Sequence, residues 1–525
     1  MWPKIHADGY RLPPPMPGPS SDHHVTLDGE LTVEQAVAIG DGAVIELAPE
    51  AIERVAANRA TLERILSSGT PVYGISTGFG ALVSNTVAPE LQRHLQVNLL
   101  RSHAAGTGSE LPAELVRIAM AVRCNGLLLG HSGVRPVVLE RVAALLNGGY
   151  VPCVPRTGSL GASGDLAPSA HAFLPLLGEG VVRDSSGGVV AGAEALRALG
   201  AEPLELESKE GLALINGTHF MSAVGALVAA RVRRLLDTID LVTAATIDAL
   251  RGALPAFDPR VHELRPLSGQ PRSAANIAAA LRDSGRIAGG RAGLGSGRLQ
   301  DAYSLRCAAQ VHGAAREAHR FFSELVVADL NAVTDNPLVF DDEVISAGNF
   351  HGQSLALAFD TIRLALADLG SISERRTFRL VSPSLNGRLP PFLTFDAGAS
   401  SGYMVIQYTA AALVAELRAL AQPVSIDSIP TSDNQEDHVS MGMTAAMMAL
   451  DAVPRLERIV AIELLCACQA RDCDPGDPAP AVAALHAAVR ELVPTLTVDR
   501  PPAEDLTAVL PLVQAGVGGA DSPSQ

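Results

Sequence analysis

One short stretch of the chain has residue types that could turn the backbone itself into an electrophile. Residues 158–171 read Gly-Ser-Leu-Gly-Ala-Ser-Gly-Asp-Leu-Ala-Pro-Ser-Ala-His. A backbone nitrogen can attack a preceding carbonyl only where the chain bends tightly, and Gly164 removes a Cβ at the attacking position while Ala162 stays small. Loss of two waters would leave Ser163 as a dehydroalanine arm on a methylidene-imidazolone ring, which accepts amines. Asp165 and the proline three residues later indicate a helix start, whose dipole would favour negative charge on that ring.

A Gly-Ala-Ser-Gly turn alone is usually only a turn, and the surrounding sequence changes that interpretation. The chain resembles the aromatic amino acid ammonia-lyases and aminomutases, which use a self-made methylidene-imidazolone (MIO). The resemblance covers nearly all of the chain after Val25. It is carried by seven blocks in the family's order: Tyr73-Gly-Ile-Ser-Thr-Gly-Phe-Gly80, Gly158-Ser-Leu-Gly-Ala-Ser-Gly-Asp165, Gly211-Leu-Ala-Leu-Ile-Asn-Gly-Thr218, Gln300-Asp-Ala-Tyr-Ser-Leu-Arg306, Asp335-Asn-Pro-Leu338, Gly348-Asn-Phe-His351 and Asn434-Gln-Glu-Asp-His438.

The resemblance implies that MIO forms autocatalytically from Ala162-Ser163-Gly164 and that the substrate amine adds to the carbon derived from Ser163. Tyr73 would then remove the β-proton. A phenol has a pKa of about 10, so a phenolate near neutrality needs roughly 4 kcal/mol of differential stabilisation. The glycines around Tyr73 suit a lid whose closure excludes water. Read without the family, Tyr73 is a loop tyrosine that anchors a turn.

Other site residues follow from the same resemblance. Arg306 would clamp the substrate carboxylate, for which a planar guanidinium is well matched. Asn216, Gln300 and Tyr303 would surround the ring and the carboxylate, although each could instead be a satisfied buried polar group. Phe350 would pack beside the heterocycle, or serve only the core.

Glu436 has two interpretations. It is expected in the first turn of a helix that Ser432 and Gln435 cap, so it is either a substrate contact or a carboxylate favoured by the helix dipole. The resemblance makes it part of the catalytic site.

The side chain of the substrate is expected to meet Ser102 and His103, with Met404 lining the same pocket. This pair resembles histidine ammonia-lyases, whereas a phenylalanine enzyme would show a larger apolar residue there. His103 can donate or accept a hydrogen bond, so tyrosine remains an alternative substrate. Gln353 and Ser76 depart from the histidine pattern.

These residues lead to one main hypothesis, an ammonia-lyase that converts L-histidine to urocanate. A tyrosine ammonia-lyase or tyrosine 2,3-aminomutase shares the first half of that mechanism and is the alternative. A non-catalytic scaffold of the same fold is the alternative from another class.

Composition narrows the possible partners and compartment. The 525 residues carry a formal net charge of −16, which argues against nucleic acid and anionic membranes and favours a small-molecule substrate. The six cysteines lack the spacing of a disulfide framework or a zinc site, so we expect reduced thiols, no metal and a cytoplasmic protein.

The fold class expected is mainly α. Hydrophobic residues make up 47% and aromatic residues 4%, which suits an Ala/Leu/Val interior between closely packed helices. Helical spacing recurs after Leu355, Leu413 and Leu456, and short hairpins are expected at 40–47 and 180–191. The resemblance implies an elongated bundle of long helices, a smaller mixed N-terminal domain that bears the MIO loop, and a homotetramer whose active sites combine several subunits. The expected divisions are a disordered tail (1–24), the MIO-bearing domain (25–215), the central helix bundle (216–475) and a C-terminal helical portion (476–525).

Overall fold

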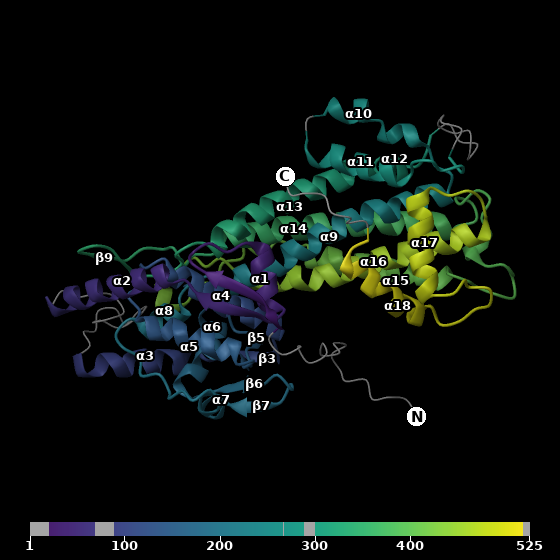
Figure 1. The fold of residues 1–525 in the computed structure, drawn as a ribbon. Coiled ribbons are helices and arrows are strands. Elements are labelled where there is room, and N and C mark those ends of the chain that lie inside the picture. Colours follow the sequence, from purple (N-terminus) through teal and green to yellow (C-terminus); the bar gives the residue numbers. More distant parts are fainter. Residues whose placement is uncertain (1–19, 69–88, 266, 288–299, 518–525) are drawn as a thin grey trace. The chain divides into compact units, whose positions relative to one another are not determined.

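The computed structural model describes residues 20–68, 89–265, 267–287 and 300–517, and within them the chain is mainly helical (Figure 1). This confirms the expected fold class. No described helix is both long enough and apolar enough to span a membrane. The chain divides into two compact units, each made of separate segments. Unit 1 comprises residues 1–226, 326–355 and 426–444, and unit 2 comprises residues 227–325, 356–425 and 445–525.

Short helices dominate the first part of unit 1. α1 begins behind a capping box in which Thr32 and Gln35 satisfy each other's backbone N–H groups. Residues 115–128 of α4 are buried on every side, so this helix forms the centre of its packing layer. The helices are α1 Val33–Gly40, α2 Pro49–Ser67, α3 Pro89–His103, α4 Ala113–Leu128, α5 Pro136–Asn147, α6 Leu166–Phe173, α7 Gly192–Ala198 and α8 Glu210–Ile215, with 3-10 turns η2 Leu174–Leu177 and η5 Ser432–Asn434.

The strands of unit 1 are short. β6 (Val181–Arg183) and β7 (Val189–Ala191) form the antiparallel hairpin expected at 180–191, and β4 (Val151–Pro152) joins β6. The hairpin expected at 40–47 is wrong: β2 (Ala43–Leu47) pairs in parallel with β1 (Ser20–Leu27), because α1 returns the chain between them. β1 overlaps the last residues of the expected tail. The remaining pairs are β3 Thr107–Glu110 with β5 Pro155–Thr157, and β8 Leu338–Val339 with β9 Val344–Ile345.

Long helices follow, and the helical spacings after Leu355, Leu413 and Leu456 are confirmed in α14, α15 and α16. The long helices are α9 His219–Ala249, α13 Ala308–Leu330, α14 Gln353–Val381, α15 Met404–Leu420 and α16 Gly442–Cys473. Shorter elements complete unit 2: η3 Leu254–Phe257, α10 Pro259–Glu263, α11 Gly269–Ala280, α12 Tyr303–Arg306, η4 Pro391–Leu393, α17 Pro480–Leu492 and α18 Pro502–Ala515.

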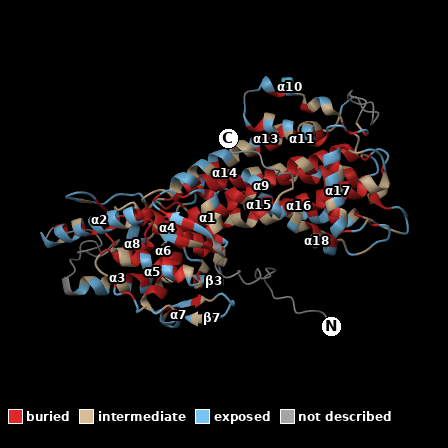
Figure 2. Ribbon diagram, viewed as in Figure 1, coloured by how far each residue is buried: buried red, intermediate tan, exposed pale blue. Residues whose placement is uncertain are grey.

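The cores consist largely of alanine, leucine and valine on the inward faces of these helices (Figure 2). Unit 2 also buries charge: Glu463 on α16 accepts from Arg376 and Ser373 on α14 and from Thr246 on α9. The six cysteines are unpaired thiols, and burial raises the pKa of Cys124 to about 12, so this thiol stays protonated. Among the described residues, no group of His, Cys, Asp and Glu side chains could hold a metal ion.

Candidate active site

The loop at 158–165 is folded into a tight turn with three residues of positive φ near its centre. Gly161, Ser163 and Gly164 have φ angles of 86°, 51° and 82°, which lie in the left-handed region. The Gly164 amide nitrogen lies 3.3 Å from the Gly161 carbonyl oxygen, to which it donates a hydrogen bond. A left-handed serine is a strained residue, and such strain is held by surrounding structure at functional sites. Ala162 lies at the tip of this turn and is half-buried.

Two neighbouring segments clamp the loop. Gly217 donates its N–H to the Ser163 carbonyl at 3.3 Å and accepts from the Asp165 N–H at 2.7 Å. On the other side, the Met441 N–H donates to Leu160 at 2.9 Å. A Cβ added at Gly164 would collide with the carbonyl of Gly217. Position 164 therefore has no room for a side chain. The residues of the loop fit the ring that the sequence predicts.

Asn216 meets Ser163 directly. The Ser163 hydroxyl donates to Asn216 Oδ1 at 2.5 Å. The Asn216 amide nitrogen donates to the Asn336 carbonyl at 3.0 Å and to Asp335 Oδ1 at 3.3 Å. The structure thus joins two residues predicted from the sequence and adds Asp335, which lay in a quoted block but received no role there.

Asp165 follows the loop and is fully buried. It precedes α6, as expected, but its carboxylate makes no bond to that helix; Oδ2 accepts from the N–H groups of Phe220 and Met221 in the first turn of α9. Burial raises the pKa of Asp165 to about 7, although the two N–H groups oppose the shift. A buried acid that is half protonated near neutrality therefore adjoins the loop.

His103 ends α3, and its hydrogen bonds define how it can meet a substrate. Nδ1 lies 2.9 Å from the Leu99 carbonyl oxygen, which can only accept, so Nδ1 carries the proton. Burial lowers the pKa of His103, while the Leu99 carbonyl and the charge of Glu436 oppose this. Neutral His103 therefore presents Nε2 as a hydrogen-bond acceptor. Ser102 is exposed, and its hydroxyl donates to the same carbonyl at 3.2 Å.

Glu436 lies in an extended segment, and the helix expected around it is wrong. Residues 432, 433 and 434 all have positive φ, so η5 ends at once, and Glu436 pairs with Thr431 as an isolated β-bridge. The Thr431 hydroxyl donates to Glu436 Oε2 at 2.7 Å. This removes the helix-dipole interpretation of the carboxylate. Thr431 carried no signal in the sequence, since a lone threonine before a polar run is common.

Phe350 lies in the turn before α14 and is half-buried. The next residue, His351, stacks on His438 with ring centroids 5.9 Å apart and an interplanar angle of 1°. His351 Nε2 donates to the His438 carbonyl at 3.1 Å. These contacts hold the Phe350 turn against the segment that carries Glu436. The packing of Phe350 beside a heterocycle stays a prediction.

Four predicted residues belong to unit 2. Gln300 and Tyr303 are exposed, the latter by 69%, and Met404 is the half-buried first residue of α15. Arg306 places its guanidinium carbon 4.6 Å from the Tyr303 ring centroid. Its Nε is buried and has no hydrogen-bond partner among the described residues.

Tyr73, predicted as the base, and Ser76 lie outside the described residues.

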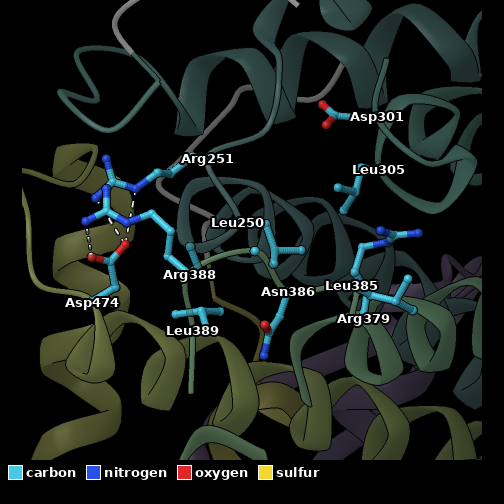
Figure 3. Close-up of a pocket in the computed structure, with 12 residues that line it drawn as sticks. Leu250, Arg251, Asp301, Leu305, Arg379, Leu385, Asn386, Arg388, Leu389 and Asp474 are labelled. Atoms are coloured by element: carbon cyan, nitrogen blue, oxygen red, sulfur yellow. Dashed lines mark hydrogen bonds and ion pairs between the residues drawn. The ribbon is translucent and has the colours of Figure 1, made fainter. Parts of the chain in front are cut away.

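A cavity of about 60 Å³ in unit 2 offers a different candidate site (Figure 3). Its polar wall is an ion-pair cluster: Asp474 lies 3.0 Å from Arg251 and 3.9 Å from Arg388. None of the predicted site residues lines this cavity. We therefore assign the chemistry to the loop of unit 1.

Comparisons with known proteins show which family this chain resembles over most of its length. The family model for aromatic amino acid lyase matches residues 31–491. A histidine ammonia-lyase of Symbiobacterium thermophilum is 50% identical over 499 residues, which is 94% of this chain and 97% of that protein. Among solved structures, histidine ammonia-lyase from Trypanosoma cruzi has 40% identity and a TM-score of 0.86, covering 94% of this chain and 93% of that one. Tyrosine aminomutase from Streptomyces globisporus has 39% identity and a TM-score of 0.89, covering 94% and 97%.

Proposed function

This chain belongs to the aromatic amino acid lyase family, and we propose that it is a histidine ammonia-lyase, which eliminates ammonia from L-histidine to give urocanate. Full-length identity of 50% to a histidine ammonia-lyase supports this substrate. Within the site, the hydrogen bond between His103 Nδ1 and the Leu99 carbonyl supports a substrate whose ring carries a donor. With Nδ1 bonded to Leu99, Nε2 accepts a hydrogen bond, and an imidazole N–H of the substrate donates one.

The electrophile is MIO, formed from Ala162, Ser163 and Gly164. When present, it supplies the electron-poor carbon that converts the substrate amine into a leaving group. Gly217 would hold it through the Ser163 carbonyl, which it already bonds, and Asn216 would lie beside it, because Asn216 bonds the Ser163 hydroxyl that leaves as the ring forms. The strained φ of Ser163 and the collision that a Cβ at Gly164 would cause support this assignment.

The remaining steps fall to side chains of the chain itself. Glu436, whose charge acts on His103, accepts the second N–H that the substrate ring carries in its imidazolium form and fixes the ring. Arg306 binds the substrate carboxylate, and Tyr303 and Gln300 complete that end of the site. The walls of the substrate site are formed by Ser102, Phe350 and Met404. Tyr73 removes the β-proton.

The protein acts as a homotetramer in the cytosol. Arg306, Tyr303 and Gln300 of unit 2 reach each site from other copies of the chain. The exposed Tyr303 ring supports a surface that binds something outside its own unit.

The test is turnover of L-histidine by the purified protein, followed by urocanate absorbance and released ammonia. Wild type should convert histidine, and Ser163→Ala should not, because alanine cannot lose a hydroxyl to form the electrophile. Phenylalanine should react poorly, since its ring has no donor for His103. Conversion of tyrosine to coumarate with no histidine turnover would replace this proposal by a tyrosine ammonia-lyase, and accumulation of β-tyrosine by an aminomutase.

A further inference from the structure

A fully buried lysine lies behind Asn216. Lys209 immediately precedes α8, has a φ of 80° and a side chain that is 0% exposed. Its ammonium Nζ donates to Asp335 Oδ2 at 2.6 Å. The guanidinium of Arg123 lies 3.6 Å from the same oxygen and donates to the Ala213 carbonyl. Burying a lysine costs free energy unless its charge is paired, so the buried Lys209 depends on Asp335 as its partner.

The two oxygens of Asp335 serve different partners. Oδ2 accepts a hydrogen bond from the Lys209 ammonium. Oδ1 accepts from the Asn336 N–H at 2.7 Å and from Asn216 Nδ2 at 3.3 Å. Burial raises the pKa of Asp335, but Lys209 and Arg123 outweigh it and hold the pKa below its usual range. Only an ionised carboxylate accepts at both oxygens.

This arrangement decides which way the Asn216 amide faces. Its nitrogen donates to Asp335 Oδ1 and to the Asn336 carbonyl, so its oxygen is left to face the Ser163 hydroxyl. A reversed amide would set its oxygen against two acceptors in a buried site, which costs both hydrogen bonds. The orientation of Asn216 therefore depends on the charge state and orientation of Asp335.

We propose that Lys209 acts through Asp335 to hold the Asn216 oxygen toward Ser163, which makes both of them positioning residues for the conversion of the loop into its electrophile. This inference rests on the proposed function. In that conversion the Gly164 nitrogen bonds to the Ala162 carbonyl carbon, whose oxygen leaves as water with the protons of the Gly164 and Ser163 nitrogens. The Ser163 hydroxyl leaves as a second water with the Cα proton, and a C=C bond forms.

The sharpest test is Asp335→Asn, which keeps the shape and removes one acceptor. Lys209 will hold the new amide oxygen, so the new NH₂ group faces the NH₂ group of Asn216 and opposes its orientation, which the Asn336 carbonyl alone then holds. Conversion is followed by intact mass on freshly synthesised protein, as the loss of two waters over time. We expect roughly ten- to a hundredfold slower conversion, the usual effect of losing a hydrogen bond to a charged group.

The double variant Lys209→Met with Asp335→Asn separates positioning from general damage. Without the ammonium, residue 335 keeps only the longer 3.6 Å contact with Arg123 on that side, so its amide can turn its oxygen toward Asn216, and conversion should be faster than in Asp335→Asn alone. A purely structural role predicts the opposite, since two buried groups are then changed. A double variant that converts no faster than the single variant overturns the proposal. If Asp335→Asn does not fold, Lys209→Met alone is measured, and conversion at the wild-type rate overturns it.

A matched control changes a buried carboxylate elsewhere. Asp240 in unit 2 accepts from His312 at 2.7 Å and from Arg316 at 2.6 Å, and it has no bond to Asn216. Asp240→Asn should lower the unfolding temperature and leave the conversion rate unchanged. A wild-type chain that never loses two waters would refute the proposed function. If the wild type loses two waters and the Lys209 and Asp335 variants do so at the same rate, this inference is refuted and the proposed function is not.

Discussion

Glu436 is held by Thr431, and that contact sets how its carboxylate meets a substrate. Glu436→Gln replaces a charged acceptor for the imidazole N–H by a neutral one. Losing a charge-assisted hydrogen bond costs ~1.5 to 3 kcal/mol, so histidine turnover should fall roughly ten- to a hundredfold. Steady-state urocanate formation measures it. A much larger loss would mean that Glu436 also transfers protons.

Thr431→Val provides the matched control for this prediction. It leaves the charge of Glu436 in place and removes only the hydroxyl that orients it, so we expect a loss of at most about tenfold. If Thr431→Val is as damaging as Glu436→Gln, orientation rather than charge is the main contribution of Glu436.

The raised pKa of Asp165 predicts how the free energy of unfolding varies with pH. Its folded pKa of about 7 is raised above the unfolded value of about 3.9, so the folded protein binds this proton more tightly. The stability that it contributes is complete below about pH 4 and is lost as the pH rises to about 7, by up to roughly 4 kcal/mol. Asp165→Asn copies the protonated form. Denaturant unfolding between pH 4 and 8 should show a smaller fall for this variant, and an unchanged fall would contradict the pKa of Asp165.

Sequence patterns predicted the types and order of the candidate site residues but not their partners. Ser163 and Asn216 lie in separate quoted blocks, and the structure bonds them. Lys209 and Asp335 are 126 positions apart and meet only in the fold. Nothing in the local sequence distinguishes a lysine that will be buried from one on the surface, because its partner is fixed by tertiary packing.

The link between helices α8 and α9 contacts the 158–165 loop through the backbone of Gly217. Gly217 has a φ of 136°, and a Cβ there would collide with Thr334. Gly217→Ala should therefore shift the link, slow the loss of two waters in intact-mass spectra and reduce stability by about 1 to 3 kcal/mol.

Gly187→Ala is the control for Gly217→Ala, because it strains the backbone without a steric collision. It has a φ of 84° in the turn between β6 and β7, and a Cβ there meets nothing within 4 Å. Gly187→Ala should cost stability through strain alone and leave conversion and turnover unchanged. If both glycine variants convert normally, the α8–α9 link does not hold the loop.

Helices with regular apolar spacing were predictable, and elements defined by single backbone angles were not. The spacing after Leu355 predicted α14 because one face of a helix meets the core at each turn. The segment around Glu436 has helix-capping residues, yet positive φ at three successive residues ends η5 before a helix can start. The parallel pairing of β1 with β2 was missed because glycines near residue 40 suggest a turn, whereas α1 crosses over.

At the scale of the whole molecule, exposed apolar residues indicate an assembly. Leu357, Leu364 and Phe378 on α14 are 36–54% exposed, and Val405 and Tyr408 on α15 are 55% and 57% exposed. Their spacing on α14 is a multiple of seven, which is one helix face. Sedimentation should give a tetramer, and Leu364→Glu should dissociate it with loss of activity. Ala57→Glu, at an exposed position of α2, adds the same charge and should leave the tetramer intact.

Mixed tetramers test whether a site takes residues from more than one copy of the chain. Ser163→Ala destroys the contribution of unit 1, and Arg306→Ala destroys that of unit 2, so each variant alone should be nearly inactive. If the loop comes from one copy and Arg306 from another, co-expression at equal amounts produces sites in which both are intact. Random mixing makes these about one quarter of all sites, and histidine turnover should recover to about that fraction. Recovery depends on mixing within one tetramer, so combining the purified homotetramers should restore nothing. Co-expressed variants that form mixed tetramers but stay inactive would mean that each site takes its loop and its Arg306 from the same chain.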